Sequence, residues 1–180
     1  SNLKQIKNKD PLFNPSKVAI NSNLSKTKKN IIIIPGASFR SKCYSVKKFG
    51  KLTTLIDANF MAVWGNPEEK QMSLRIKEYS PKVIICEALS IDSLALLISE
   101  SDLVIGGDTG PTHMAWALNI PSITLFGPTP GYRNTYKTKI NWIIESESKV
   151  NPKKINKNDF SINSIPVQKI LKASLELLEN

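Results

Sequence analysis

The chain is organised around the segment Ser101-Asp-Leu-Val-Ile-Gly-Gly-Asp-Thr-Gly-Pro-Thr-His-Met-Ala-Trp-Ala-Leu-Asn-Ile-Pro-Ser-Ile-Thr-Leu-Phe-Gly-Pro-Thr-Pro-Gly131. An apolar run meets two glycines, an acid and a hydroxyl, and a second apolar run ends in Gly-Pro after a stretch that holds the single histidine. This order predicts strand, tight turn, helix and strand. The first N–H groups of such a helix have no partner inside it and carry partial positive charge, so they favour phosphate binding. Thr109 can cap this helix, and Pro111 fits its first turn.

Strands and helices alternate on both sides of this segment. Ile31–Ile34 is a β-branched apolar run, typical of a strand buried on both faces. Further strands are predicted at 60–63, 81–85 and 140–144, and helices at 45–57, 67–79, 90–100 and 167–178. The buried stripe of helix 45–57 is predicted at Val46, Phe49, Leu52, Leu55 and Ile56, and that of helix 90–100 at Ile91, Leu94, Ala95, Leu97 and Ile98.

This alternation predicts an α/β fold, because strands joined by helices form right-handed parallel crossovers. The expected architecture is an open, doubly wound, Rossmann-like parallel sheet over residues 31–180, with residues 1–30 as a linker or lead-in and the lysine-rich segment 149–163 as loop. Ligands of such sheets bind beyond the carboxyl ends of the strands. The turns at 35–42, 64–69, 106–113 and 127–133 are therefore expected to converge on one cleft.

Composition narrows the function classes. No apolar run approaches the roughly 20 residues of a membrane span and no signal-peptide pattern opens the chain, so a cytoplasmic protein is expected. Cys43 and Cys86 lie in unrelated contexts, which indicates neither a disulfide framework nor a metal site. The net charge of +10 reflects either solvated surface lysines or attraction to an anionic partner, such as a phosphorylated glycolipid at the inner membrane face. No basic stripe interleaved with aromatics indicates nucleic-acid binding.

The convergent turns carry polar groups that suit a ligand with a pyrophosphate and hydroxyl-rich sugars. Helix N–H groups and a lysine would hold phosphate, and a glutamate would accept hydrogen bonds from a ribose diol. The absence of Gly-x-Gly-x-x-Gly after the first strand weakens a nicotinamide or flavin interpretation, and no Walker loop or Gly-x-Ser-x-Gly elbow is present. The candidate residues are Arg40, Lys42, Glu68, Glu69, Asp108, Thr109, Gly110 and His113.

Three sequence blocks resemble one enzyme family. The block from Gly107 to Thr129 resembles the nucleotide-sugar signature of bacterial lipopolysaccharide heptosyltransferases, glycosyltransferase family nine. Pro35-Gly-Ala-Ser38 followed by Lys42-x-Tyr-Ser, and Trp64-Gly-x-x-Glu68, are similar to two further blocks in the same order. The resemblance covers residues 31–178, and the loop 128–131 is slightly more similar to the first heptosyltransferase of the pathway than to the second.

The resemblance implies an inverting GT-B transferase with two Rossmann-like halves and no need for a metal or cofactor. It covers only the carboxyl-terminal half, which binds the donor ADP-L-glycero-D-manno-heptose. The amino-terminal half holds the anionic Kdo–lipid A acceptor and the acid thought to act as base. The chain alone is therefore expected to contain no catalytic residue and to bind donor without transferring sugar. A monomer in peripheral contact with the inner membrane is expected.

Carried over motif by motif, the resemblance assigns a role to each candidate. Lys42 would neutralise pyrophosphate, Glu68 would hold the ribose, and Asp108 would contact heptose hydroxyls. The N–H groups of Thr109 and Gly110 would bind phosphate, with His113 beside it. Two departures leave alternatives open, because Cys43-Tyr44-Ser45 replaces the usual Trp-Pro after the lysine and Glu69 competes with Glu68.

Each assignment has a structural alternative. His113 could bond a carbonyl at the helix start, Asp108 could cap the turn, and Lys42 could be solvated surface. Glu68 could be no more than an acid that favours the first turn of its helix. Two other functions compete with a nucleotide-sugar site: a nicotinamide-dinucleotide-binding domain of a dehydrogenase, and a non-enzymatic basic module for nucleic acid or anionic membrane.

Overall fold

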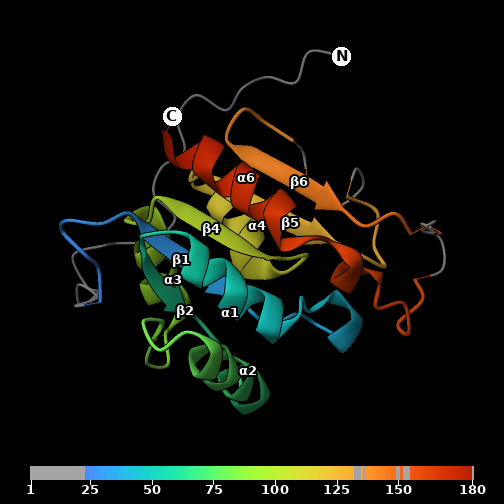
Figure 1. Cartoon of the computed structure of the whole chain (residues 1–180), viewed down its shortest axis with the longest axis horizontal. Helices are drawn as coiled ribbons and strands as arrows, with labels where there is room; N and C mark the ends of the chain where they lie inside the picture. The colour runs from blue at the N-terminus through green and yellow to red at the C-terminus, as the bar shows by residue number, and fades with distance from the viewer. Residues whose placement is uncertain (1–22, 132–134, 136, 149–150, 152–154, 180) are drawn as a thin grey trace.

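The computed structural model describes residues 23–131, 135, 137–148, 151 and 155–179 (Figure 1). Most of the lead-in predicted at 1–30 lies outside these residues, as do Lys149, Lys153 and Lys154 of the predicted loop. Residues 23–29 already contact the domain, because Leu24 packs against its core and Asn59 Nδ2 donates to the carbonyl of residue 23 at 2.7 Å.

The described strands form one parallel sheet in the order β3-β2-β1-β4-β5-β6. This order confirms the predicted open, doubly wound α/β fold. The strands are β1 (Asn30–Ile34), β2 (Asn59–Ala62), β3 (Ile84–Ile85), β4 (Leu103–Gly107), β5 (Ser122–Phe126) and β6 (Asn141–Glu145). The helices are α1 (Val46–Leu55), α2 (Pro67–Tyr79), α3 (Ile91–Ser99), α4 (Gly110–Ala117) and α6 (Val167–Glu179), with 3-10 turns η2 (Arg40–Lys42) and η3 (Ser161–Ser164).

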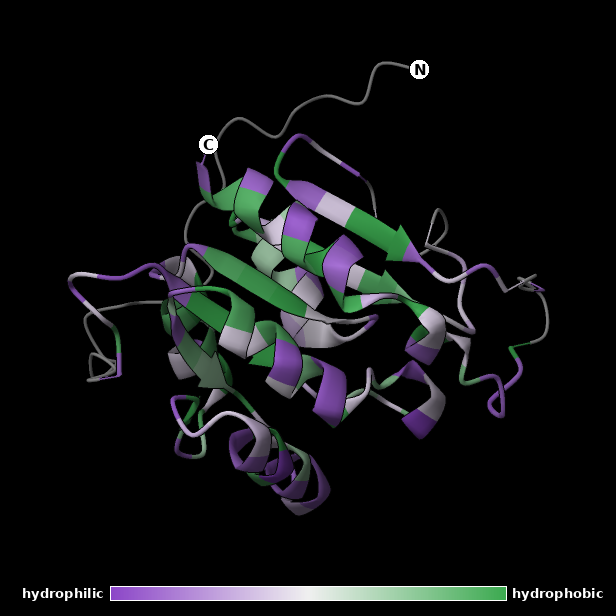
Figure 2. Cartoon of the chain, in the orientation of Figure 1, coloured by the Kyte–Doolittle hydropathy of each residue, from purple (hydrophilic) through white to green (hydrophobic). Residues whose placement is uncertain are grey.

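The sheet separates two apolar cores (Figure 1). Successive residues of a strand face opposite sides, so Ile31 and Ile33 pack under α1 and α6 while Ile32 and Ile34 pack toward α3 and α4. Figure 2 shows the apolar residues concentrated in the strands and the polar residues on the outward faces of the helices. Burial on both faces explains why β1 reads as an unbroken apolar run.

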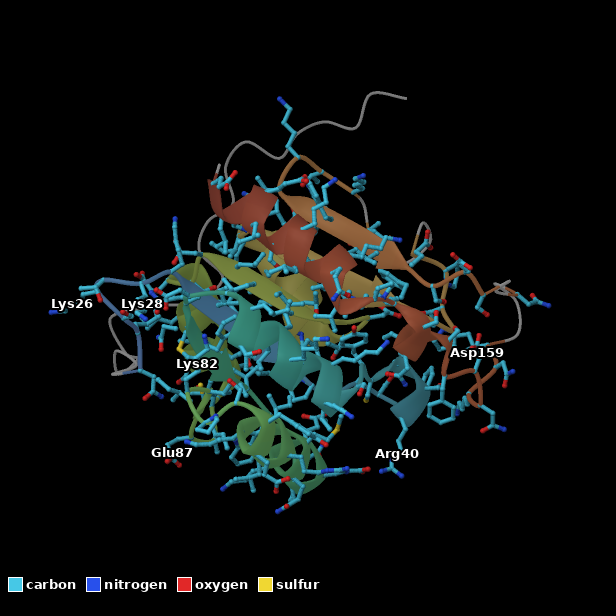
Figure 3. All side chains as sticks on the ribbon, in the orientation of Figure 1. Lys26, Lys28, Arg40, Lys82, Glu87 and Asp159 are labelled. Atoms are coloured by element: carbon cyan, nitrogen blue, oxygen red, sulfur yellow. The ribbon has the colours of Figure 1, made fainter. Side chains whose placement is uncertain are left out.

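The direction of the strand order reverses between β1 and β4. From β1 the chain moves outward to β2 and β3, and from β4 it moves the other way to β5 and β6. In open α/β sheets, ligands bind beyond the carboxyl ends of the strands at such a reversal, the topological switch point. Arg40 and Asp159 lie at this end of the molecule and Lys26 and Lys28 at the opposite end (Figure 3).

Local sequence explains the bounds of the helices that lead away from this edge. α2 has its predicted bounds, since Asn66 accepts a hydrogen bond from the Glu69 N–H at 3.0 Å and Pro67 occupies the first position. α4 begins after Thr109, whose side chain makes no capping hydrogen bond, contrary to the cap predicted for it. α4 is followed by Asn119, which has a left-handed φ of 59°, and by Pro121.

Some predictions of burial and extent are wrong. Leu55 is exposed, because the buried face of α1 runs through Phe49, Leu52 and Thr53 and Leu55 lies off it. Ile91 is 76% exposed, because it is the first residue of α3 and lies beyond the core. The spacing of apolar residues along a helix does not show which end of the helix extends past the core. Helix 45–57 ends at residue 55, strand 81–85 shortens to 84–85, and the predicted loop 149–163 contains the start of η3.

In the part of the chain that the structure describes, no helix has the length and apolar character needed to cross a membrane. The His, Cys, Asp and Glu residues of this part form no group of three or more that could hold a metal ion.

Candidate functional site

A buried carboxylate at the end of β4 joins three of the converging loops. Asp108 is 6% exposed, and its Oδ2 lies 2.6 Å from Lys42 Nζ, which comes from the loop after β1. Its Oδ1 lies 2.9 Å from His113 Nε2 in the first turn of α4. Thr129, in the loop after β5, donates its hydroxyl to Oδ2 at 3.1 Å. The predicted convergence of the loops after β1, β4 and β5 is thus confirmed at one carboxylate.

Glycines allow these loops to approach each other. A Cβ on Gly107 would stand 2.5 Å from the carbonyl oxygen of Lys42, so only glycine lets the η2 loop lie against β4. A Cβ on Gly106 would meet Ile34 Cβ at 2.9 Å and Thr112 Oγ1 at 2.8 Å. Thr112 donates to the Gly107 carbonyl at 2.9 Å, which fixes the start of α4 on the strand it follows. The two glycines of the sequence motif therefore position the ion pair.

The N-terminus of α4 is open to solvent on one side. A Cβ on Gly110 would meet no atom within 4 Å, and the Thr109 hydroxyl does not cap the helix. Pro111 carries no N–H, so the Gly110 and Thr112 amides are the donors that the first turn offers. These N–H groups carry the positive end of the helix dipole. The space beside Gly110 can therefore take an anionic group.

The two adjacent acids of α2 differ in position. Glu68 is 68% exposed and faces Arg40, with its Oε1 3.5 Å from Nε. Glu69 turns inward, where its Oε2 accepts from the Gly65 N–H at 2.7 Å, and a Cβ on Gly36 would overlap its carboxyl. Gly36 follows β1 and Gly65 follows β2, so Glu69 lies between the carboxyl ends of neighbouring strands. Glu68 thus lies outside the Asp108 cluster and is paired with Arg40, whereas Glu69 is bonded to the backbone at the strand ends.

Two residues of this edge were not predicted from the sequence. Thr129 was available from the sequence, because it lies in a turn predicted to reach the cleft and carries a hydroxyl. Phe39 gave no such signal, and its role appears only in three dimensions, where its ring centroid lies 4.9 Å from Lys42 Nζ. A ring face attracts a cation, so Phe39 helps to hold the Lys42 side chain in place.

Two groups beside Lys42 are structural. Tyr44 is buried and donates its hydroxyl to the carbonyl of Ile165 at 2.8 Å, and burial raises its pKa far above the ordinary value. Burial also raises the pKa of the Cys43 thiol, with smaller contributions from Glu69 and Glu68 in the same direction. A thiol with a raised pKa is a weak nucleophile at neutral pH. Tyr44, which lies in the segment that replaces Trp-Pro after the lysine, thus attaches the η2 loop to the end of η3.

The arrangement fits anion binding better than nucleophilic catalysis. An ammonium group, an imidazole and open helix N–H groups meet at one edge, and the carboxylate among them is buried with both oxygens accepting hydrogen bonds. Lys42 has three N–H donors, so it can bind a phosphate oxygen while it stays on Asp108. Glu69 adds a carboxylate that can accept hydrogen bonds from the hydroxyls of a ligand.

Comparison with known sequences identifies relatives of the chain. The profile of glycosyltransferase family 9 (heptosyltransferase) matches residues 3–160. Lipopolysaccharide heptosyltransferase 1 of Campylobacter coli is 41% identical over 164 residues, which are 86% of this chain and 48% of that protein. The enzyme of the same name from Salmonella typhimurium is 35% identical over 74 residues, which are 41% of this chain and 23% of that protein. The chain thus spans about half or less of the length of these relatives.

Solved structures give a consistent picture of the fold. Escherichia coli heptosyltransferase WaaC with ADP-2-deoxy-2-fluoro heptose superposes with a TM-score of 0.68 at 20% identity, over 86% of this chain and 45% of that one. Escherichia coli ADP-heptose lipopolysaccharide heptosyltransferase II gives a TM-score of 0.70 at 20% identity, over 87% of this chain and 48% of that one. At these identities the structural likeness shows a shared fold.

Proposed function

Because this chain belongs to glycosyltransferase family 9, we propose that it is the donor-binding, carboxyl-terminal half of a lipopolysaccharide heptosyltransferase. Its ligand is ADP-L-glycero-D-manno-heptose. The complete enzyme transfers the heptose with inversion to the Kdo–lipid A inner core. The similarity to enzymes named heptosyltransferase 1 supports the first heptose of the core as the product.

One observation carries the proposal: the open N-terminus of α4 lies at the β1–β4 switch point, beside the Lys42–Asp108–His113 cluster. In doubly wound sheets this is where a nucleotide phosphate binds. The diphosphate of the donor would accept from the amides of the α4 first turn and from Lys42. His113 is held on Asp108 through Nε2, so its ring borders the same space.

The ribose and the sugar need acceptors as well as donors. The inward position of Glu69 between Gly36 and Gly65 favours it over Glu68 for holding the ribose diol. Contact of Asp108 with a heptose hydroxyl remains part of the proposal, with the buried ion pair fixing its orientation.

The role of this half in the reaction is to stabilise the leaving group. As the acceptor oxygen bonds to the anomeric carbon, the bond from that carbon to the ADP phosphate breaks and charge grows on the diphosphate. Lys42 and the α4 N–H groups would bind this growing charge, which is the kind of electrostatic stabilisation that lowers such barriers. The acceptor proton goes to a base in the amino-terminal half. No metal ion or cofactor is needed in this scheme.

Titration calorimetry of the chain with ADP-heptose and ADP tests the proposal. We expect binding of both and no binding of NAD. Preference for NAD would instead revive the dehydrogenase alternative, which the family match does not support. Salt-sensitive binding to duplex DNA or to anionic vesicles, with no response to any nucleotide, would indicate the non-enzymatic basic module. In a cell, we expect the complete enzyme at the cytoplasmic face of the inner membrane, as a monomer.

A further inference from the structure

A second lysine reaches the site from the connection between β6 and α6. Lys157 Nζ lies 5.8 Å from the centroid of the Phe39 ring, and Lys42 Nζ lies 4.9 Å from the same centroid. One aromatic ring at the carboxyl edge therefore has two ammonium groups beside it. Lys157 lies in the segment that the sequence predicted as a solvated, lysine-rich loop.

The segment that carries Lys157 is attached to the carboxyl edge at several points. Asp159 accepts hydrogen bonds from the Ser148 hydroxyl at 2.7 Å and from the Ser161 N–H at 2.9 Å. In η3, Ile162 packs on Gly127, where a Cβ would stand 2.6 Å from the Ile162 nitrogen. These contacts hold the backbone beyond Lys157 against the end of β5, so the position of this lysine is set by the fold.

Charge balance distinguishes Lys157 from the two cations of η2. Lys42 is paired with Asp108 and Arg40 with Glu68. Lys157 forms no ion pair with a carboxylate of the described residues. A nucleoside diphosphate brings at least two negative charges, while the N-terminus of α4 supplies about half a positive charge. To bind such a ligand, this edge needs a cation whose charge no protein carboxylate already neutralises.

We propose that Lys157 is a second phosphate-binding cation of the nucleotide site, held at the carboxyl edge of the sheet by Phe39. The inference rests on the proposed function, because it adds a residue to the same site. The exposed Lys157 ammonium is weakly bound by the ring, whereas its hydrogen bond to a phosphate oxygen is charge-assisted. Lys157 therefore exchanges the ring for the diphosphate when the nucleotide binds.

The chain provides a matched control for this lysine. Lys137 Nζ lies 5.8 Å from the ring centroid of Trp142, the same separation as for Lys157 and Phe39. Lys137 precedes β6, so it lies at the amino edge of the sheet, away from the site. Both lysines are exposed and neither is in a helix or strand. Replacing either by alanine removes one positive charge and one cation–ring contact, and only the position differs.

The experiment measures the affinity of the 180-residue chain for ADP and for adenosine by calorimetry at low ionic strength. We expect Lys157→Ala to weaken ADP binding about fivefold to tenfold, with adenosine unchanged, because the lost contact is to phosphate. The weakening should shrink as salt is raised, since the charge is exposed. Lys157→Arg should restore ADP affinity, and Lys137→Ala should leave both ligands unaffected.

The outcomes separate this inference from the proposed function. If the unmodified chain binds neither ADP nor ADP-heptose, the proposed function fails and the role of Lys157 with it. If the chain binds ADP and Lys157→Ala binds it equally well, the inference is wrong while the proposed function stands. Equal loss of ADP and adenosine affinity would also overturn it, because Lys157 would then act through the packing of Phe39.

Discussion

The carbonyl oxygen of Lys42 lies against Gly107, in space that any side chain at position 107 would occupy. This contact brings the η2 loop, which follows β1, onto the end of β4. The lysine whose backbone makes the contact also carries the ammonium group that pairs with Asp108. The backbone contact and the ion pair thus both connect strands β1 to β3 with strands β4 to β6.

Gly107→Ala should therefore destabilise the protein by about 2–3 kcal/mol, because the added Cβ meets backbone that cannot move freely. Gly110→Ala is the matched control, since a Cβ there meets nothing within 4 Å and the backbone needs no left-handed conformation. It should leave the stability unchanged or raise it slightly, by less than about 1 kcal/mol. Urea unfolding measures both, and equal losses for the two variants would contradict the contact.

Asp108→Asn should lower the free energy of unfolding by about 3 kcal/mol, because it leaves the largely buried Lys42 ammonium without its counter-charge. Asp57→Asn is the control, since the Lys28–Asp57 pair is exposed and should contribute nothing measurable. The double variant Asp108→Asn with Lys42→Met should lose less than the sum of the single variants, because the two side chains interact directly. Additive losses would show that the pair is not coupled.

Glu69→Gln should weaken ADP binding by about tenfold if Glu69 holds the ribose, whereas Glu68→Gln should have little effect. The measurement that identifies the contact is affinity for 2′-deoxy-ADP and 3′-deoxy-ADP. For the analogue that lacks the hydroxyl bound by the glutamate, Glu69→Gln should reduce the binding affinity less than it does for ADP. A larger effect at Glu68 would return the ribose role to the residue assigned from the sequence motif.

Asp159 should make the attachment of η3 sensitive to acid. Burial alone would raise its pKa, but hydrogen bonds from Ser148 and Ser161 outweigh burial and lower the pKa below the ordinary 3.8. The charged form is therefore favoured in the folded state, so its stabilisation is complete above about pH 5 and is lost as the pH falls from there through the folded pKa. Melting temperatures of the parent chain and Asp159→Asn should differ at pH 7, and the difference should shrink as the pH falls into the acid range. A pH-independent difference would contradict this.

The sequence predicted the architecture because the fold depends on patterns that a chain displays locally. The Ile31–Ile34 run marks a strand buried on both faces, and the Asn66-Pro67 start of α2 carries its own cap. The residues that were misjudged, Leu55 and Ile91, depend on where each helix lies relative to the sheet. That position is set by packing between distant segments, which spacing along one helix does not encode.

The sequence predicted which residues lie in the candidate site but not which of them contact each other. The motif after β4 and the loop rule placed Lys42, Asp108 and His113 at one edge, and the structure brings these three into contact. Two features depend on loop geometry that glycine contacts set. Asp108 is buried under Lys42 and Thr129, and Glu69 turns inward while Glu68 turns outward. Phe39 and Lys157 meet across more than a hundred residues and leave no local signal.

The sheet order has a consequence for how the protein folds. Strands β1 to β3 and strands β4 to β6 each pair with near neighbours in the sequence, whereas β1 and β4 are joined across a long intervening segment. Pairing across a long segment costs more chain entropy and is reached later. Lys42 belongs to the first group of strands and Asp108 to the second, so their ion pair forms only when the two groups meet. Ligand binding would therefore be among the last properties that a refolding chain acquires. The time at which binding appears would report when β1 pairs with β4.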